Sequence, residues 1–344
     1  MIQDPVIAAS DLMRVRRIIT HADCPDGIAS AMILHSCLPE AGIVFCRYGS
    51  SELARLTAQC GDLFCDFAPP RDRVGEWLRY PTVVLDHHES QKDIVGMFKH
   101  GVYSDKPGVS GAVLAYRHVW EPIFKYHPNP GYTTDTNEWV KNFAQLAGIR
   151  DTWQTSDPLW GESCEQASAL SFFPVMGLLS IHPNTWEDKL TSIGKLLVRK
   201  RAEKIAKVLD KAYEYESQHS GIVLCFQDDG GLISDVADLV KTRYPQVSVV
   251  AGFQYFTDRG AQKMKISLRS NHDVDVSVIA SRWGGGGHKA AAGLVIPAPF
   301  ENPYEFISGG KIQALGRKVS RWLPEPPKPP PSDEPDPTSP WGWY

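Results

Sequence analysis

The chain has 344 residues, of which 42% are hydrophobic and 10% aromatic, so it is long enough for two domains that each bury an apolar core. Its formal net charge of −4 argues against a broad basic surface that binds long duplex DNA through many phosphates, but not against one small anionic substrate in a local pocket. The seven cysteines are scattered without the spacing of a zinc cage, which predicts reduced thiols.

In the first half of the chain, an apolar strand runs three times into an acidic or histidine-bearing loop. We predict these strands within residues 16–20, 61–65 and 82–85, with a helix at 28–38 after the first. Strands that alternate with helices predict a parallel sheet, in which a site lies beyond the carboxyl ends of the strands.

Carboxylate and imidazole side chains gather at these predicted strand ends, and a further carboxylate follows a short helical segment in the stretch "GIRDTW". The residues are His21, Asp23, Asp26, Asp66, Asp86, His87, His88 and Asp151. Any one of them alone is more commonly a helix cap or a surface charge. Together they are ligands that Mn²⁺ and Mg²⁺ accept, and they suffice for two ions about 3.5–4 Å apart that share one carboxylate.

The second half of the chain predicts a long helix and a second α/β unit. Apolar residues recur at near-helical spacing over 184–218, and the apolar strands 221–226 and 247–253 flank a helix at 234–244. An alternating strand follows at 263–270. We therefore predict an α/β protein of two lobes, with a mainly parallel sheet flanked by helices in the first, a smaller substrate lobe over 219–322, and a long helix joining them.

A glycine-rich stretch, "SRWGGGGHKAAAG", follows the last predicted strand. Without side chains, the backbone N–H groups of Gly285, Gly286 and Gly287 can approach a phosphate or carboxylate closely. Arg269, at the end of the preceding strand, is suited to bidentate phosphate capture.

Five motifs in this order resemble the DHH phosphoesterase superfamily: "THADCPDGIASA", "CDF", "DHH", "GIRDT" and "GGGGHKAAAG". The C-terminal part is similar to the DHH-associated substrate domain of RecJ-type exonucleases, nanoRNases and phosphoadenosine-phosphate phosphatases. The resemblance spans about residues 15–295. It implies a catalytic domain over 1–183, a linker helix over 184–218 and a substrate domain over 219–322.

The resemblance also implies a role for each motif residue. Asp66 would bridge two metal ions, with His21, Asp26 and Asp23 on one ion and His87 and Asp151 on the other, while Asp86 orients its neighbours. His88, Arg269 and His288 would act on the substrate phosphate, and Ser270 would join the three glycines in binding substrate. The first motif has an uncommon spacing, so whether Asp23 reaches a metal stays open.

The implied function is a phosphoester hydrolase that uses two Mn²⁺ ions, with Mg²⁺ or Co²⁺ as alternatives. Its expected substrates are short single-stranded oligonucleotides, dinucleotides or nucleoside bisphosphates, because the chain has no length left for a further nucleic-acid-binding domain. A single-strand exonuclease acting on longer nucleic acid and a non-catalytic nucleotide-binding protein remain as alternatives.

Location and partners are less strongly indicated. The N-terminus lacks the apolar region of a signal peptide and no apolar run is long enough to span a bilayer, so we expect a cytoplasmic protein with no membrane contact. The proline-rich and acidic residues 323–344 predict a flexible tail. A homodimer and protein docking through this tail stay open.

Overall fold

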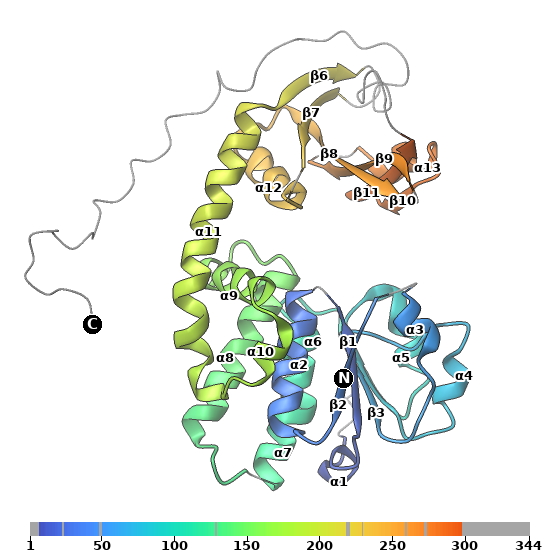
Figure 1. Cartoon of the computed structure of the whole chain (residues 1–344), viewed down its shortest axis with the longest axis vertical. Helices are drawn as coiled ribbons and strands as arrows, with labels where there is room; N and C mark the ends of the chain where they lie inside the picture. Colours follow the sequence, from blue (N-terminus) through green and yellow to red (C-terminus); the bar gives the residue numbers. More distant parts are fainter. Residues whose placement is uncertain are drawn as a thin grey trace, which may run out of the picture. The chain divides into compact units, whose positions relative to one another are not determined.

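The chain folds into two compact units, Met1–Lys200 and Arg201–Tyr344. The computed structural model describes residues 7–22, 24–47, 50–127, 129–217, 221–228, 230–258, 260–271 and 274–297, with only the backbone for 187, 213, 215–217 and 288. Figure 1 shows both units and labels most of their helices and strands. The predicted α/β fold class is confirmed, since one unit contains a parallel sheet with helices and the other a mixed sheet with helices.

The first unit contains a five-stranded sheet and most of the helices. Its strands are β1 (Arg17–His21), β2 (Gly42–Cys46), β3 (Asp62–Cys65), β4 (Val83–Asp86) and β5 (His100–Tyr103). Its helices are α1 (Ala9–Leu12), α2 (Pro25–Cys37), α3 (Ser51–Arg55), α4 (Val74–Trp77), α5 (Lys92–Val95), α6 (Gly111–Ala115), α7 (Glu121–Tyr126), α8 (Thr134–Asp151), α9 (Trp160–Phe172) and α10 (Val175–Leu179). Short 3-10 turns lie at Glu89–Gln91 and Pro183–Thr185, and a π-helical turn lies at Tyr116–Trp120.

All strands of this sheet are parallel, in the order β2-β1-β3-β4-β5. Successive side chains of a strand point to opposite faces, so Ile18 and Leu63 join one apolar cluster while Ile19 and Phe64 join another. Helices α2, α6, α8 and α9 lie on one side of the sheet and α3, α4 and α5 on the other (Figure 1). Burial of both faces explains why consecutive positions such as Ile18 and Ile19, or Leu63 and Phe64, are apolar.

The second unit contains a six-stranded mixed sheet in the order β10-β11-β9-β8-β7-β6. Its elements are β6 (Tyr213–Ser217), β7 (Gly221–Gln227), α12 (Ile233–Arg243), β8 (Val247–Asp258), β9 (Ala261–Ser270), α13 (Val276–Ser281), β10 (Gly286–His288) and β11 (Ala291–Pro297). Only β7 and β8 pair in parallel, with α12 between them in sequence, and the other neighbours are antiparallel. The predicted strands and the predicted helix of this unit are present within a few residues of their expected bounds.

The predicted helix over 184–218 is wrong at its C-terminal end. Helix α11 (Trp186–Asp210) runs across the division between the two units and ends at Asp210, and the next strand is β6. The sequence of β6, "YEYES", alternates with a period of two, which favours a strand over a helix. A helical spacing that continues to Ala212 obscured this change of period.

No helix among the described segments combines the length and the apolar character that crossing a membrane requires. The predicted tail, 323–344, lies outside the described residues, as do residues 298–322 of the predicted substrate lobe.

Candidate functional site

The polar residues at the ends of three neighbouring strands meet at one edge of the first sheet. His21 is the last residue of β1, Asp66 follows β3 directly, and Asp86 is the last residue of β4. These strands are adjacent in the sheet, and the backbone N–H of Asp66 donates to the carbonyl of Leu85 at 3.0 Å. A parallel sheet brings the carboxyl ends of its strands together, so residues 45 positions apart along the chain become neighbours here.

Asp66 lies at the centre of this group. Its side chain is buried, and its backbone has a φ of 55°, a left-handed conformation that is strained for a residue other than glycine. Among the residues that the structure describes, the buried Oδ2 atom of Asp66 has no hydrogen-bond partner. A buried carboxylate oxygen without a donor is unfavourable, and a cation at this position would satisfy it.

His87 lies between two carboxylates. Its Nε2 atom is 3.2 Å from Oδ1 of Asp66 and 3.4 Å from Oδ2 of Asp151 at the end of α8. Ligand atoms of Asp26, His87 and Asp151 all lie within 4.8 Å of one another, and so do those of Asp66, His87 and His88. Asp26 therefore lies in the group of His87 and Asp151, whereas the resemblance implied a place with His21.

Asp86 contacts both histidines that follow it. Its Oδ1 atom accepts the backbone N–H groups of His87 at 2.7 Å and of His88 at 3.0 Å, and it lies 2.7 Å from Nδ1 of His88. Because an ionised carboxylate only accepts, Nδ1 of His88 carries the proton and the ring is held with Nε2 directed away. This hydrogen bond to Asp86 also raises the pKa of His88. These contacts are those that the orienting role predicted for Asp86 requires.

Asp26 is fixed by the segment that starts α6, a contact that the sequence did not reveal. Its Oδ1 atom accepts the Ser110 hydroxyl at 2.5 Å and the backbone N–H of Ala112 at 3.1 Å, and its Oδ2 atom accepts the N–H of Gly111 at 2.7 Å. The run of small residues at 110–112, just before an apolar helix, was the available signal.

Two glycines allow the carboxylates to approach this closely. A Cβ atom on Gly111 would lie 2.4 Å from Cβ of Asp66 and 2.9 Å from Oδ2 of Asp26. A Cβ atom on Gly27 would lie 2.2 Å from the carbonyl oxygen of His21. Real Cβ atoms do not pack at such distances, so both positions require glycine for this arrangement.

The clustered acids repel one another when charged. Burial, with the neighbouring charges of Asp26 and Asp151, raises the pKa of Asp66 well above its usual range. Burial and Asp26 raise the pKa of Asp151 to about 6, although His87 acts in the opposite direction. Burial and the nearby His88 lower the pKa of His21, so its neutral ring is available as a ligand. A divalent cation would reverse this repulsion among the carboxylates.

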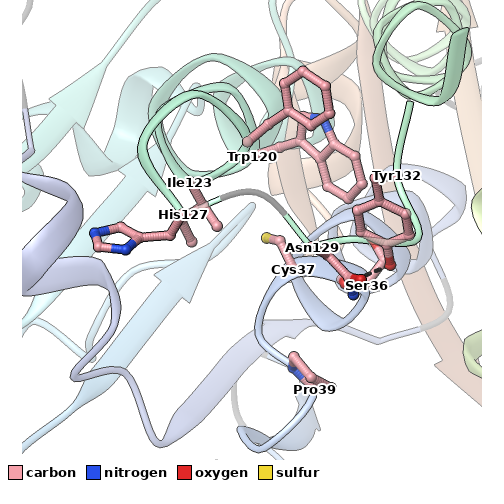
Figure 2. Close-up of a pocket in the computed structure, with 9 residues that line it drawn as sticks. Ser36, Cys37, Pro39, Trp120, Ile123, His127, Asn129 and Tyr132 are labelled. Carbon is pink, nitrogen blue, oxygen red and sulfur yellow. Dashed lines mark hydrogen bonds between the residues drawn. The ribbon is translucent and has the colours of Figure 1, made fainter. Parts of the chain in front are cut away.

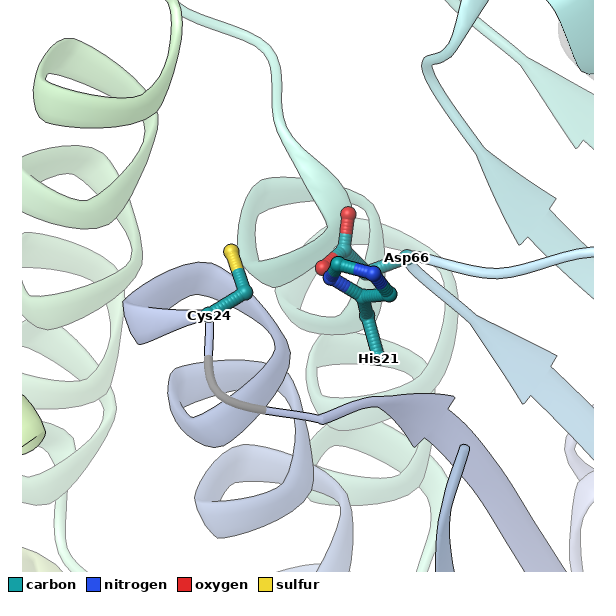
Figure 3. Close-up of side chains that lie close together, drawn as sticks. All are labelled: His21, Cys24 and Asp66. Atoms are coloured by element: carbon teal, nitrogen blue, oxygen red, sulfur yellow. The ribbon is translucent and has the colours of Figure 1, made fainter. Parts of the chain in front are cut away.

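One cysteine, Cys24, lies in this cluster, although the spacing of the cysteines predicts no zinc cage. The Sγ atom of Cys24 and ligand atoms of His21 and Asp66 lie within 4.8 Å of one another. Figure 3 shows the three side chains side by side at the start of α2. The predicted ligand Asp23 lies outside the described residues.

In the second unit, the pairing of three strands brings the predicted substrate residues together. Position 288 in β10 pairs with Ala291 in β11, and Ala291 pairs with Arg269 in β9. The backbone N–H of Ser270 donates to the carbonyl of Ala290 at 2.9 Å. His288 and Arg269 are thus in one row across the sheet, while the side chain of His288 lies outside what the structure describes.

The glycine stretch is not the simple turn that its sequence predicts, because part of it forms β10. A Cβ atom on Gly285 would lie 2.3 Å from the carbonyl oxygen of Gly293, and one on Gly287 would lie 2.5 Å from that of Ala291. These two glycines therefore permit close strand packing. A Cβ atom on Gly286 would meet nothing within 4 Å, so this position is open to a ligand.

A pocket elsewhere in the first unit has a different chemical character. Figure 2 shows it beside the C-terminal end of α2, where the Tyr132 hydroxyl donates to the carbonyl of Ser36 at 2.7 Å. It is lined by Ser36, Cys37, Pro39, Trp120, Ile123, Phe124, His127, Asn129 and Tyr132. Because no carboxylate lines this pocket, it lacks the donors of the strand-end cluster.

Comparison with known proteins bears first on the second unit. The family model of the DHHA1 domain matches residues 218–323. This part of the chain is therefore similar to DHHA1 domains. The DHHA1 match thus covers strands β7 to β11 of the second sheet, the Arg269 row and the glycine stretch. Among curated proteins, none matches the chain in sequence.

Solved structures resemble the chain over most of its length. The DHH domain of a member of the s1p family of ribosomal proteins is 16% identical, with a TM-score of 0.54, and the match covers 83% of each chain. The pGpG-specific phosphodiesterase PggH from Vibrio cholerae is 14% identical, with a TM-score of 0.49 and coverage of 82% of this chain and 93% of that one. With the DHHA1 domain, the shared fold of the DHH-domain structure confirms the resemblance to the DHH superfamily.

Proposed function

We propose that the chain is a metal-dependent phosphoester hydrolase that acts on short oligonucleotides, dinucleotides or nucleoside bisphosphates. The observation that carries this proposal is the buried Oδ2 atom of Asp66, which has no hydrogen-bond partner among the described residues. The side chain of Asp66 also lies close to the imidazole rings of His21, His87 and His88. The left-handed backbone of Asp66 and the glycines packed against it support the same conclusion, because strained backbone concentrates at functional sites.

The donor set fits hard or borderline divalent ions. Carboxylate oxygens and imidazole nitrogens are ligands that Mn²⁺ accepts. They come from Asp66 and His87, with Asp26 and Asp151 beside His87, on one side, and from Asp66 and His21 on the other. Asp66 belongs to both groups, as the predicted bridge between two ions requires. When bound, two such ions supply an activated water and neutralise charge on a phosphate.

His88 is the proposed contact to the reacting phosphate. Its side chain is 41% exposed, more than the 12% of His87, so its Nε2 edge is available to a substrate. Asp86 fixes the ring and raises its pKa, and an imidazolium is suited to binding a phosphate oxygen or donating a proton to a leaving group.

Arg269 is the proposed phosphate ligand of the DHHA1 domain. Its guanidinium is held by the Ser234 hydroxyl at 3.2 Å and by the carbonyl of Leu268 at 3.0 Å. A partly buried, fixed guanidinium recognises phosphate better than a mobile one, because less side-chain entropy is lost on binding. We propose that the open Gly286 position, Ser270 and His288 complete this subsite.

The substrate class is tested with a panel in Mn²⁺: labelled dinucleotides, five-residue and 24-residue RNA and DNA, phosphoadenosine phosphate and pyrophosphate. Release of mononucleotides or of phosphate from the small substrates alone is the expected result. Degradation of the 24-residue strands would identify the exonuclease alternative. If the protein binds metal but hydrolyses no substrate in the panel, the non-catalytic nucleotide-binding alternative would be favoured.

A further inference from the structure

Cys24 lies directly before helix α2, where a thiol is an uncommon residue. It is the residue before α2, its backbone is extended, and its side chain makes no capping hydrogen bond. A helix start normally has Ser, Thr, Asp or Asn at this position, because their oxygen atoms accept a free backbone N–H. The next residue, Pro25, has no N–H group. The Cys24 side chain instead lies with His21 and Asp66.

Cys24 lies with two further side chains that could bind a metal ion, and the three offer atoms of different elements. Its sulfur, an imidazole nitrogen of His21 and a carboxylate oxygen of Asp66 lie within 4.8 Å of one another (Figure 3). A Cβ atom on Gly27 would come within 3.2 Å of Oδ2 of Asp66, so glycine keeps this oxygen accessible.

A second observation, independent of the cysteine, points to a cation at the same place. Asp66 is 1% exposed, and its Oδ2 atom has no hydrogen-bond partner among the described residues. Neither a neutral thiol nor a neutral imidazole removes the cost of that burial as fully as a divalent ion would.

We propose that Cys24, His21 and Asp66 form a sulfur–nitrogen–oxygen position that selects a thiophilic divalent ion, Zn²⁺ or Co²⁺, over Mn²⁺ and Mg²⁺. Soft thiolate ligands favour such ions, whereas the position of Asp66, His87 and Asp151 offers only nitrogen and oxygen. On binding, the metal–sulfur bond replaces the S–H bond and the thiol proton passes to solvent. This inference deepens the proposed function and rests on it.

The test is titration of the metal-free full chain with Co²⁺, followed by calorimetry and by near-ultraviolet absorbance. Thiolate ligation produces a sulfur-to-cobalt charge-transfer band that nitrogen and oxygen ligands do not. We expect the band in the wild type and in the control Cys60→Ser, whose thiol is exposed, and its loss in Cys24→Ser. The Co²⁺ affinity of Cys24→Ser should fall at least about tenfold relative to its Mn²⁺ affinity, because loss of residues that merely orient ligands already costs about 10–100-fold.

Two outcomes separate this inference from the proposed function. Co²⁺ binding without a charge-transfer band, or with a band that survives Cys24→Ser, overturns the role of Cys24 and leaves the metal centre intact. No Co²⁺ or Mn²⁺ binding at all overturns the metal centre itself.

A measurement on the wild type covers the case in which Cys24→Ser does not fold. Zn²⁺ should protect Cys24 from alkylation while Cys60 stays reactive, as read by peptide mass mapping. Equal alkylation of Cys24 with and without bound Zn²⁺ would contradict the inference.

Discussion

Replacing Asp151 with asparagine should stabilise the metal-free protein. In the folded state, burial and Asp26 raise the pKa of Asp151 from 3.8 to about 6. Each pKa unit corresponds to about 1.4 kcal/mol, and solvent screens part of this effect at a partly exposed residue, so the charged carboxylate of Asp151 destabilises the fold by about 1–2 kcal/mol. The asparagine side chain has the same shape and carries no charge.

The pH dependence follows from the direction of this pKa change. A carboxyl whose pKa is higher in the folded than in the unfolded state contributes its stability fully below the unfolded value of 3.8. That contribution is lost as the pH rises through about 6. The advantage of Asp151→Asn should therefore be full at about pH 7.5 and small at about pH 4.

Urea unfolding in EDTA at these two pH values measures the effect. We expect Asp151→Asn to raise the free energy of unfolding at about pH 7.5 by about 1–2 kcal/mol, and saturating Mn²⁺ to offset this difference. Metal at about 100 times its Kd adds about 2.7 kcal/mol to the wild type, and the variant gains less. Asp105→Asn is the control, because Asp105 is 66% exposed and its ion pair with Lys92 at 3.6 Å should contribute little. A variant less stable than the wild type in EDTA at about pH 7.5 would refute the argument.

Three further predictions follow from single contacts. Gly111→Ala should destabilise the protein by about 1–3 kcal/mol and weaken Mn²⁺ binding, because the new Cβ atom would lie 2.4 Å from Cβ of Asp66. Thermal unfolding and calorimetry measure the two effects. The control Gly75→Ala should show neither, because its Cβ atom would meet nothing within 4 Å. Asp86→Asn should retain metal and lower kcat about 10–100-fold, because His88 loses its orienting carboxylate; an unchanged kcat would remove that role. Truncation after residue 323 should leave hydrolysis intact, and loss of activity would show that the proline-rich segment is part of the working protein.

The sequence was sufficient to predict the strand-end cluster because the rule behind it is local. Apolar strands such as that before Asp66 are recognisable by composition, and a parallel sheet places their carboxyl ends together. The sequence alone therefore predicts that His21, Asp66, Asp86 and His87 belong to one site.

Contacts made across the fold could not be predicted in this way. Ser110 and Gly111 lie 84 and 85 positions after Asp26, and no local pattern relates them. Cys24 was missed because its partners, His21 and Asp66, come from two different strands, so no cysteine spacing reveals them. The close packing of Gly285 and Gly287 against the neighbouring strand was also not evident from the sequence, and their role in substrate binding stays a prediction.

The central claim is that hydrolysis depends on metal held by Asp66. The most direct test measures hydrolysis of a labelled dinucleotide by the EDTA-stripped protein, before and after Mn²⁺ is added, with Asp66→Asn as the paired variant. The account predicts no hydrolysis without metal, restored hydrolysis with Mn²⁺, and none in a folded Asp66→Asn under either condition. Equal hydrolysis by the stripped and Mn²⁺-loaded wild type, or full activity of Asp66→Asn, would contradict it.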